Sequence, residues 1–177
     1  MKKKLALLMA AIMTVAMVPM TAFASTKLTA VDEISVATDT NFTSTVELSK
    51  NDDQVDVTNV YGLDGTKVFD VTLELTNGKF AKNDDDDYIM EESGKFPNNK
   101  GVKAVTIEND TTATVSLNAD VFNGNNVNSD NPASLKACVL DIQAYAVETG
   151  DVTATFTSNV TNFKKASEVI ATAYDGD

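Results

Sequence analysis

The sequence predicts an all-β protein, an antiparallel two-sheet β-sandwich of immunoglobulin-like or jelly-roll type, preceded by a signal peptide. Roughly eight to ten short segments alternate apolar and polar residues, which is the spacing of strands with one buried face. Turn-forming residues separate these segments, and no stretch of about ten residues outside the signal peptide has helical spacing. Strands without crossover helices form sandwiches or barrels, and single-faced alternation favours two sheets that face each other.

The clearest strand is Val68–Thr76, in which apolar residues at odd positions alternate with polar residues at even positions. The segment Phe42–Leu48 is rich in β-branched residues, which are common in strands. Asp120–Phe122 predicts a single turn of helix. The remaining strands are predicted at Ser25–Asp39 (with a break near Asp32), Val55–Tyr61, Tyr88–Met90, Val102–Glu108, Thr111–Leu117 and Ser167–Tyr174, the last with Val169, Ala171 and Ala173 on one side.

Three hairpins are predicted from short connections between such segments. The stretch Cys138–Phe156 contains two alternating runs joined by a connection with a glycine, Gly150, and is expected to place one face in the core. Asn77-Gly78, directly after a strand, is the strongest short hairpin signal and predicts a return strand that includes Phe80. The third hairpin is expected around Asn109-Asp110.

The first residues, 1–24, have the three parts of a secretory signal peptide. Lys2 to Lys4 precede an apolar run that ends before Pro19, and Ala22-Phe23-Ala24 supplies small residues for cleavage. A membrane helix needs about 20 apolar residues, which is longer than this run, and no comparable run follows. We therefore expect a secreted protein, associated with the cell surface, whose mature part 25–177 is one sandwich domain.

The composition makes the mature surface strongly acidic. All 14 basic residues are lysine, and removing the three in the signal peptide leaves 11 against 26 acidic residues, a net charge of −15. Such a surface repels nucleic acid and anionic lipid, so neither is expected as a partner. High charge also serves plain solubility, and that alternative stays open.

Catalysis by a nucleophile and a histidine base is excluded because the chain contains no histidine. Its one cysteine, Cys138, lies on the apolar side of its segment and is expected to be a buried, inert thiol. Histidine-ligated zinc and phosphate-binding glycine loops are also missing from the sequence. A pair of carboxylates could still serve a glycosidase, which is the weakest of the hypotheses. We expect no enzyme activity and no cofactor.

The best metal-ligand chemistry lies in the acidic loop Asp84, Asp85, Asp86 and Asp87, because calcium takes carboxylate oxygens. Four adjacent aspartates cannot all face one ion, so a weak calcium site would need help from a second loop such as Asn125–Asp130. That second segment lacks the glycine and the final glutamate of a calcium-binding helix-loop-helix. A solvated acidic turn is the competing interpretation.

Aromatic rings that could stack on sugars are Tyr88, Phe96 and Tyr145. Tyr88 and Phe96 flank loops, and Tyr145 is on the polar side of its strand. A tyrosine exposed on a sheet is also ordinary cross-strand packing, and the chain has no tryptophan. These three residues are the candidates for a carbohydrate-binding surface.

A family resemblance rests on the signal peptide and three segments: FDVTLELTNGKF at 69–80, AYAVETGDVTATFTSNV at 144–160 and SEVIATAYDGD at 167–177. They resemble secreted Gram-positive surface proteins, in particular the sandwich segments of clostridial-type S-layer-associated proteins, and are similar to cohesin-like and carbohydrate-binding-like modules. The resemblance implies a non-catalytic surface module and carries over no functional residue.

Two hypotheses about function follow. The first is a non-enzymatic structural or adhesive module of a bacterial cell surface, whose partners are other cell-envelope proteins met through sheet edges and loops. The alternative is a carbohydrate-binding module that holds cell-wall polysaccharide.

Overall fold

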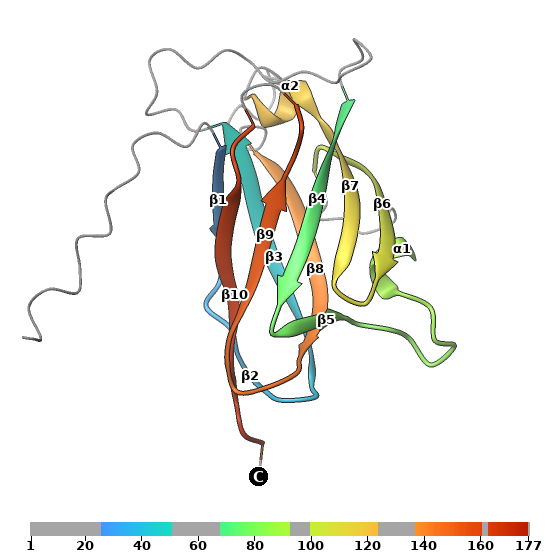
Figure 1. Cartoon of the computed structure of the whole chain (residues 1–177), viewed down its shortest axis with the longest axis vertical. Helices are drawn as coiled ribbons and strands as arrows, with labels where there is room; N and C mark the ends of the chain where they lie inside the picture. Colours follow the sequence, from blue (N-terminus) through green and yellow to red (C-terminus); the bar gives the residue numbers. More distant parts are fainter. Residues whose placement is uncertain (1–25, 51–67, 93–99, 124–136, 161–162, 177) are drawn as a thin grey trace, which may run out of the picture.

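Two β-sheets form the protein in the computed structural model, which describes residues 26–50, 68–92, 100–123, 137–160 and 163–176 (Figure 1). The four-stranded sheet has the order β1 (Thr26–Ala30), β3 (Asn41–Lys50), β8 (Cys138–Ala146), β5 (Gly78–Phe80). The six-stranded sheet has the order β2 (Ser35–Ala37), β10 (Ala166–Tyr174), β9 (Gly150–Thr157), β4 (Val68–Thr76), β7 (Thr112–Asn118), β6 (Val102–Asn109). The prediction of an all-β chain with two sheets is confirmed. All strand pairs are antiparallel except β2 with β10.

The core lies between the two sheets and is built from the alternating apolar positions of the sequence. On β4 the four odd positions from Phe69 to Leu75 are buried, and on β8 the even positions from Cys138 to Ala146 are buried. Burying one large aliphatic or aromatic side chain contributes about 1.5–3 kcal/mol, so these faces hold the sheets together. The largest fully buried side chains are Phe80, Phe122, Phe156, Leu73, Met90, Leu117, Ile142 and Ile170.

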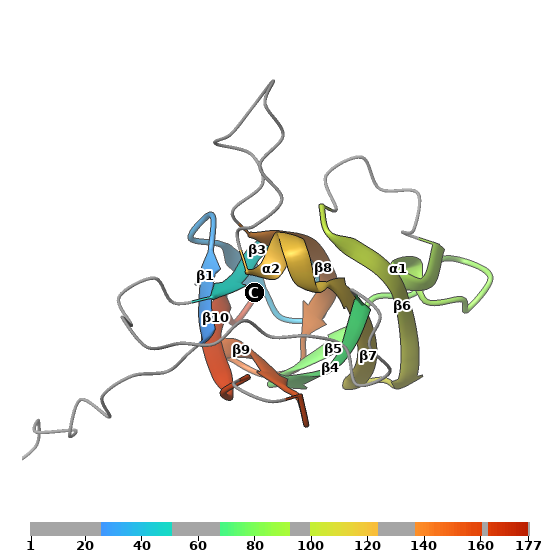
Figure 2. The same cartoon turned by 90° about the horizontal axis from the view of Figure 1, so that it is seen from above.

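One end of the sandwich is closed by the short helix α2 (Ala119–Phe122), which confirms the predicted helical turn (Figure 2). Asn118 caps it, because its Oδ1 accepts the backbone N–H groups of Asp120 at 2.9 Å and Val121 at 3.2 Å. The Phe122 ring contacts Phe69 edge-on, with ring centroids 5.4 Å apart, and stacks on Phe163 at 5.7 Å. Such pairs add to the stability that burial alone gives.

Two of the three predicted hairpins are wrong. The strands within Cys138–Phe156 exist, but β8 belongs to the four-stranded sheet and β9 to the six-stranded sheet. The chain likewise crosses between sheets at Asn77-Gly78, because β4 and β5 belong to different sheets. Alternation identifies a strand with one buried face. It does not show whether two successive strands pair within one sheet or face each other across the core, because both arrangements give the same alternation. The hairpin around Asn109-Asp110 is confirmed, with Val105 opposite Val115.

Three smaller expectations also need correction. The segment predicted as one broken strand at 25–39 forms β1 and β2, which lie in different sheets. Residues 88–90 do not form a strand: the short helix α1 (Ile89–Glu92) begins there, and Met90 is buried at the side where α1 contacts β6 and β8. On β10 a bulge between Val169 and Ala171 turns Val169 outward, so that it is exposed while Ala171 and Ala173 are buried. The expected strand at 55–61 lies outside the described residues.

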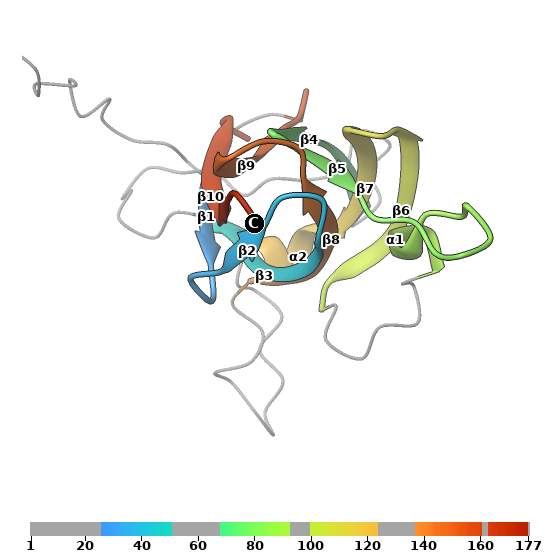
Figure 3. The same cartoon turned by 90° about the horizontal axis from the view of Figure 1, so that it is seen from below.

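The opposite end of the sandwich carries β2 and the last residues of β10 (Figure 3). The β8–β9 connection also lies there, where Gly150 has a φ of 118° that only glycine adopts readily. Among the described residues, no helix is both long and apolar enough to span a membrane. The signal peptide expected at 1–24 lies outside the described residues.

Candidate functional site

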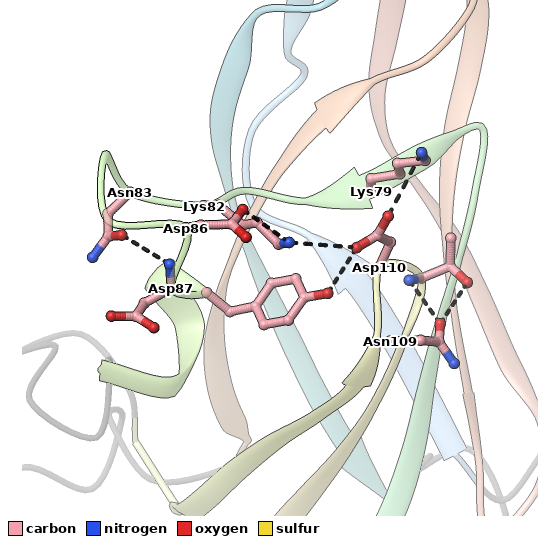
Figure 4. Close-up of polar contacts among 9 residues, drawn as sticks. Lys79, Lys82, Asn83, Asp86, Asp87, Asn109 and Asp110 are labelled. Carbon is pink, nitrogen blue, oxygen red and sulfur yellow. Dashed lines mark hydrogen bonds and ion pairs between the residues drawn. The ribbon is translucent and has the colours of Figure 1, made fainter.

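Tyr88, one of the predicted site residues, meets three charged side chains at the edge of the sandwich where β5 lies near the β6–β7 turn (Figure 4). We call Lys79, Lys82, Tyr88 and Asp110 the edge cluster. The Tyr88 hydroxyl donates to Asp110 Oδ1 at 2.7 Å, and the Lys82 ammonium lies 4.7 Å from the centre of the Tyr88 ring. Lys79 Nζ is 3.6 Å and Lys82 Nζ 4.0 Å from carboxylate oxygens of Asp110. The cluster joins the stretch from Lys79 to Tyr88 to Asp110, which lies 22 residues beyond Tyr88 in the sequence.

Backbone contacts place the cluster. Phe80 N–H donates to the Asp110 carbonyl at 2.8 Å, and Lys82 and Tyr88 form an isolated bridge. Asn109 Oδ1 accepts the N–H of Thr111 at 3.0 Å, which shapes the turn that presents Asp110. The cluster is therefore positioned by main-chain pairing between β5, the loop after it and the β6–β7 turn.

The hydrogen bond from Tyr88 lowers the pKa of the Asp110 carboxyl below its usual value, and the nearby lysine charges act in the same direction. The same bond raises the pKa of the Tyr88 hydroxyl, because the proton is shared with a carboxylate. The bond to Asp86 raises the pKa of Lys82. The three side chains therefore keep their ordinary charge states at neutral pH. Their contacts connect the loop after β5 to the β6–β7 turn.

The acidic loop is a turn organised by Asn83. Asn83 Oδ1 accepts the N–H groups of Asp85 at 3.0 Å and Asp87 at 2.9 Å, and Asp86 adopts a positive φ of 67°. Asp86 also pairs with Lys82 at 3.1 Å. Within the part of the chain that the structure describes, no three carboxylate or thiol side chains gather in a way that could hold a metal ion. Calcium binding at Asp84, Asp85, Asp86 and Asp87 stays a prediction, and the partner loop suggested for it lies outside the described residues.

The three candidate sugar-stacking rings are not brought together on one described surface. Tyr88 has Lys82 over its ring and its hydroxyl is bound by Asp110. Tyr145 is half-buried on the outer side of the four-stranded sheet, between Asn41 and Lys79 on the neighbouring strands. Phe96 lies outside the described residues. Sugar stacking on these rings stays a prediction.

The outer side of the six-stranded sheet is a broad polar surface that sequence reasoning missed. Most of its outward positions on β4, β7 and β9 carry a hydroxyl group, and we call the following residues, two of which are carboxylates, the hydroxyl face: Asp70, Thr72, Glu74, Thr76, Thr112, Thr114, Ser116, Thr153, Thr155 and Thr157. In the strand register, Thr157, Thr72 and Thr114 form one row across three strands. Strands β4, β7, β9 and β10 contain no lysine.

Hydrogen bonds between strands fix several of these side chains. Ser116 donates to Asp70 at 2.5 Å, and Thr114 donates to Glu108 of β6 at 3.2 Å. The hydroxyls of Thr155 and Ser167 lie 2.9 Å apart. The alternate residues of the same strands are fully buried, so the backbone under the face is held by the core. The sequence signal that could have predicted this face is that the polar positions of these strands are mainly threonine.

Cys138 confirms the expectation of a buried thiol. Burial raises its pKa to about 12, so the thiolate that would act as a nucleophile is not populated at neutral pH.

Comparisons with known proteins identify no family. No protein-family model matches the chain, and no curated protein matches it. Among solved structures, the chain is similar to a cohesin module from a family 33 glycoside hydrolase of Clostridium perfringens ATCC13124, with 12% identity and a TM-score of 0.43. That similarity covers 85% of this chain and 97% of the other. A TM-score below 0.5 does not establish a shared fold family.

Proposed function

We propose that this protein is a secreted, non-enzymatic module of a bacterial cell surface, of S-layer-associated type, which acts as a structural or adhesive part by binding other envelope proteins. We assign its sandwich to the immunoglobulin-like or jelly-roll kind. The observation that carries the proposal is the hydroxyl face. It is broad and polar, and it is presented by a sheet whose other side is a packed core.

Such a face suits a macromolecular partner for two physical reasons. Side chains already fixed by cross-strand hydrogen bonds lose little further entropy on binding, and this lost entropy is a main cost of association. The face also offers donors and acceptors spread over a surface, which matches a partner surface of comparable area. Its carboxylates, with no lysine on β4, β7, β9 or β10, favour a partner region of neutral or positive charge.

The experiment that tests this function measures retention of the purified mature protein on isolated bacterial envelopes. We expect retention on envelopes stripped of polysaccharide and loss of retention on envelopes treated with protease. The opposite pattern, with retention surviving protease and lost with the polysaccharide, would replace the proposal by the carbohydrate-binding alternative. Fractionation of a culture gives a second check, because protein found only in the cytosol contradicts a secreted surface module.

A further inference from the structure

A cleft with a volume of about 540 Å³ lies between the β1–β2 connection and the bulged part of β10. That volume is within the range of about 300–1,000 Å³ that is typical of ligand-binding clefts. Its lining includes Val31, Asp32 and Glu33 from the connection and Glu168 and Val169 from β10. Asp151 of β9 also reaches it, held by a hydrogen bond of 3.1 Å from Thr172 Oγ1.

The backbone beside this cleft is a free strand edge. Residues 166–169 of β10 pair with β9 on one side, but β2 pairs with β10 only from Thr172 to Tyr174. Strand β1 lies beside β10 yet pairs only with β3 (Figure 1). Among the described strands, none pairs with residues 166–170 on the side of β2. An edge of this kind offers backbone donors and acceptors that can pair with another chain.

The side chains of the cleft combine acidic and exposed apolar groups. Asp32, Glu33, Asp151 and Glu168 supply four carboxylates, and within the described residues none of them forms an ion pair with a lysine. Val31 is 52% and Val169 43% exposed, whereas most large aliphatic residues in the described part of the chain are buried. Among the described residues, these carboxylates do not form a group that could hold one metal ion. They therefore suit several separate cations better than a single ion.

Lysine and arginine have this same combination, since an aliphatic stem can lie on apolar surface while the charged head reaches a carboxylate. We propose that the cleft binds an extended, lysine-bearing segment of a partner protein, which pairs with the free edge of β10 as an added strand. Main-chain hydrogen bonds would supply affinity, and alternate side chains would meet the valines and carboxylates. This inference does not depend on the hydroxyl face, because β9 reaches the cleft only through Asp151, which is not one of the residues that define that face.

The test uses the purified mature protein and an acetylated, amidated hexapeptide of alternating lysine and valine. Affinity is measured by calorimetry for this peptide, for a peptide with glutamate in place of lysine, and for the lysine peptide N-methylated at alternate residues. The double variant Asp32→Lys with Glu168→Lys is compared with Glu47→Lys with Glu148→Lys. The second variant changes the net charge equally, at exposed positions that lie outside both the cleft and the hydroxyl face.

We expect the lysine peptide to bind, the glutamate peptide not to bind, and N-methylation to weaken binding about tenfold or more because it removes backbone donors. The cleft variant should lose about tenfold or more in affinity and the control variant less than about threefold. Equal effects of the two variants, or equal binding of the N-methylated peptide, would overturn strand addition at β10. Envelope retention is read separately, so failure here leaves the proposed function standing.

Discussion

The side chain of Asn77 pairs with both backbone groups of Glu148. Its Oδ1 accepts the Glu148 N–H at 2.9 Å, and its Nδ2 donates to the Glu148 carbonyl at 2.9 Å. Asn77 itself has a positive φ of 57°, which asparagine tolerates better than most residues. One residue at the β4–β5 crossover therefore holds the β8–β9 crossover, and the two places where the chain changes sheets are tied together.

Replacing Asn77 by alanine should lower the free energy of unfolding by about 2 kcal/mol, from two lost hydrogen bonds and the cost of a positive φ. Asn77→Gly should lose less, because glycine accepts that backbone conformation. Urea denaturation measures both. If Asn77→Ala unfolds at the wild-type midpoint, the clamp does not contribute to stability.

Ser44 provides a prediction of opposite sign. Its side chain is buried in the core, and its Oγ has no hydrogen-bond partner among the residues that the structure describes. Ser44→Ala should raise the free energy of unfolding by about 1 kcal/mol, because an unsatisfied buried hydroxyl is removed. The neighbouring Thr45 is the control, since its hydroxyl donates to Asp141 at 2.6 Å and Thr45→Val should destabilise the protein. Destabilisation by both substitutions would mean that Ser44 has a partner in solution.

Gly78 is required by packing: a Cβ there would lie 2.7 Å from Cγ1 of Val152. Gly78→Ala should therefore cost about 1–3 kcal/mol of stability through overpacking. Combining it with Val152→Ala should cost less than the sum of the two single changes, because the smaller side chain removes the clash. Additive costs in the double-mutant cycle would argue against this contact.

The edge cluster predicts a pH dependence. The pKa of Asp110 is lowered in the folded state, so its contribution to stability is present above its unfolded pKa, about 4, and is lost as the pH falls through the folded value. Tyr88→Phe should raise the pKa of Asp110 toward its usual value and cost about 1 kcal/mol at pH 7, a figure discounted because the carboxylate is half exposed.

The stability difference between wild type and Tyr88→Phe should narrow as the pH falls through the lowered pKa of Asp110, because the carboxyl then becomes protonated in both proteins. It should also narrow at high pH, as wild type loses the Tyr88 proton above the usual tyrosine pKa of about 10. Denaturation across pH and a carboxyl titration by NMR measure these effects. If the stability difference between the two proteins does not change with pH, the hydrogen bond from Tyr88 to the charged Asp110 does not contribute to stability.

Calcium binding at the acidic loop is tested by measuring the melting temperature of the protein with and without calcium. A site with a dissociation constant of about 1 mM would add about 1.4 kcal/mol at 10 mM calcium, so calcium should raise the melting temperature more than magnesium at equal ionic strength. Asp85→Asn with Asp86→Asn should reduce that difference. Equal shifts from calcium, magnesium and matched sodium chloride would leave a solvated acidic turn.

The strands could be predicted from the sequence because their period is local: β4 was predicted at Val68–Thr76 and is observed there. Which sheet each strand joins could not. The Asn77-Gly78 pair carried a hairpin signal, but the clash of a Cβ with Val152 and the clamp on Glu148 depend on residues more than 70 positions away. Three-dimensional packing decided the pairing there, against the local turn preference.

The candidate sites also combine features that the local sequence predicts with contacts that depend on the fold. The sequence singled out Tyr88 and the acidic loop as separate features, while the contact between Tyr88 and Asp110 links residues 22 positions apart and required the fold. The hydroxyl face was within reach of sequence reasoning, since Thr72 and Thr114 occupy polar positions of predicted strands and Thr157 directly follows another. Their alignment in one row needed the register of β9, β4 and β7.

The most direct test of the central claim compares two arginine substitutions of threonine on opposite sides of the sandwich. Thr72 lies in the middle of the hydroxyl face, and Thr43 is exposed on the outer side of the four-stranded sheet. The measurement is retention of each folded variant on polysaccharide-stripped envelopes. Thr72→Arg should lower retention about tenfold or more, and Thr43→Arg should stay within about twofold of wild type. Unchanged retention of Thr72→Arg, or an equal loss in both variants, would contradict binding through the hydroxyl face.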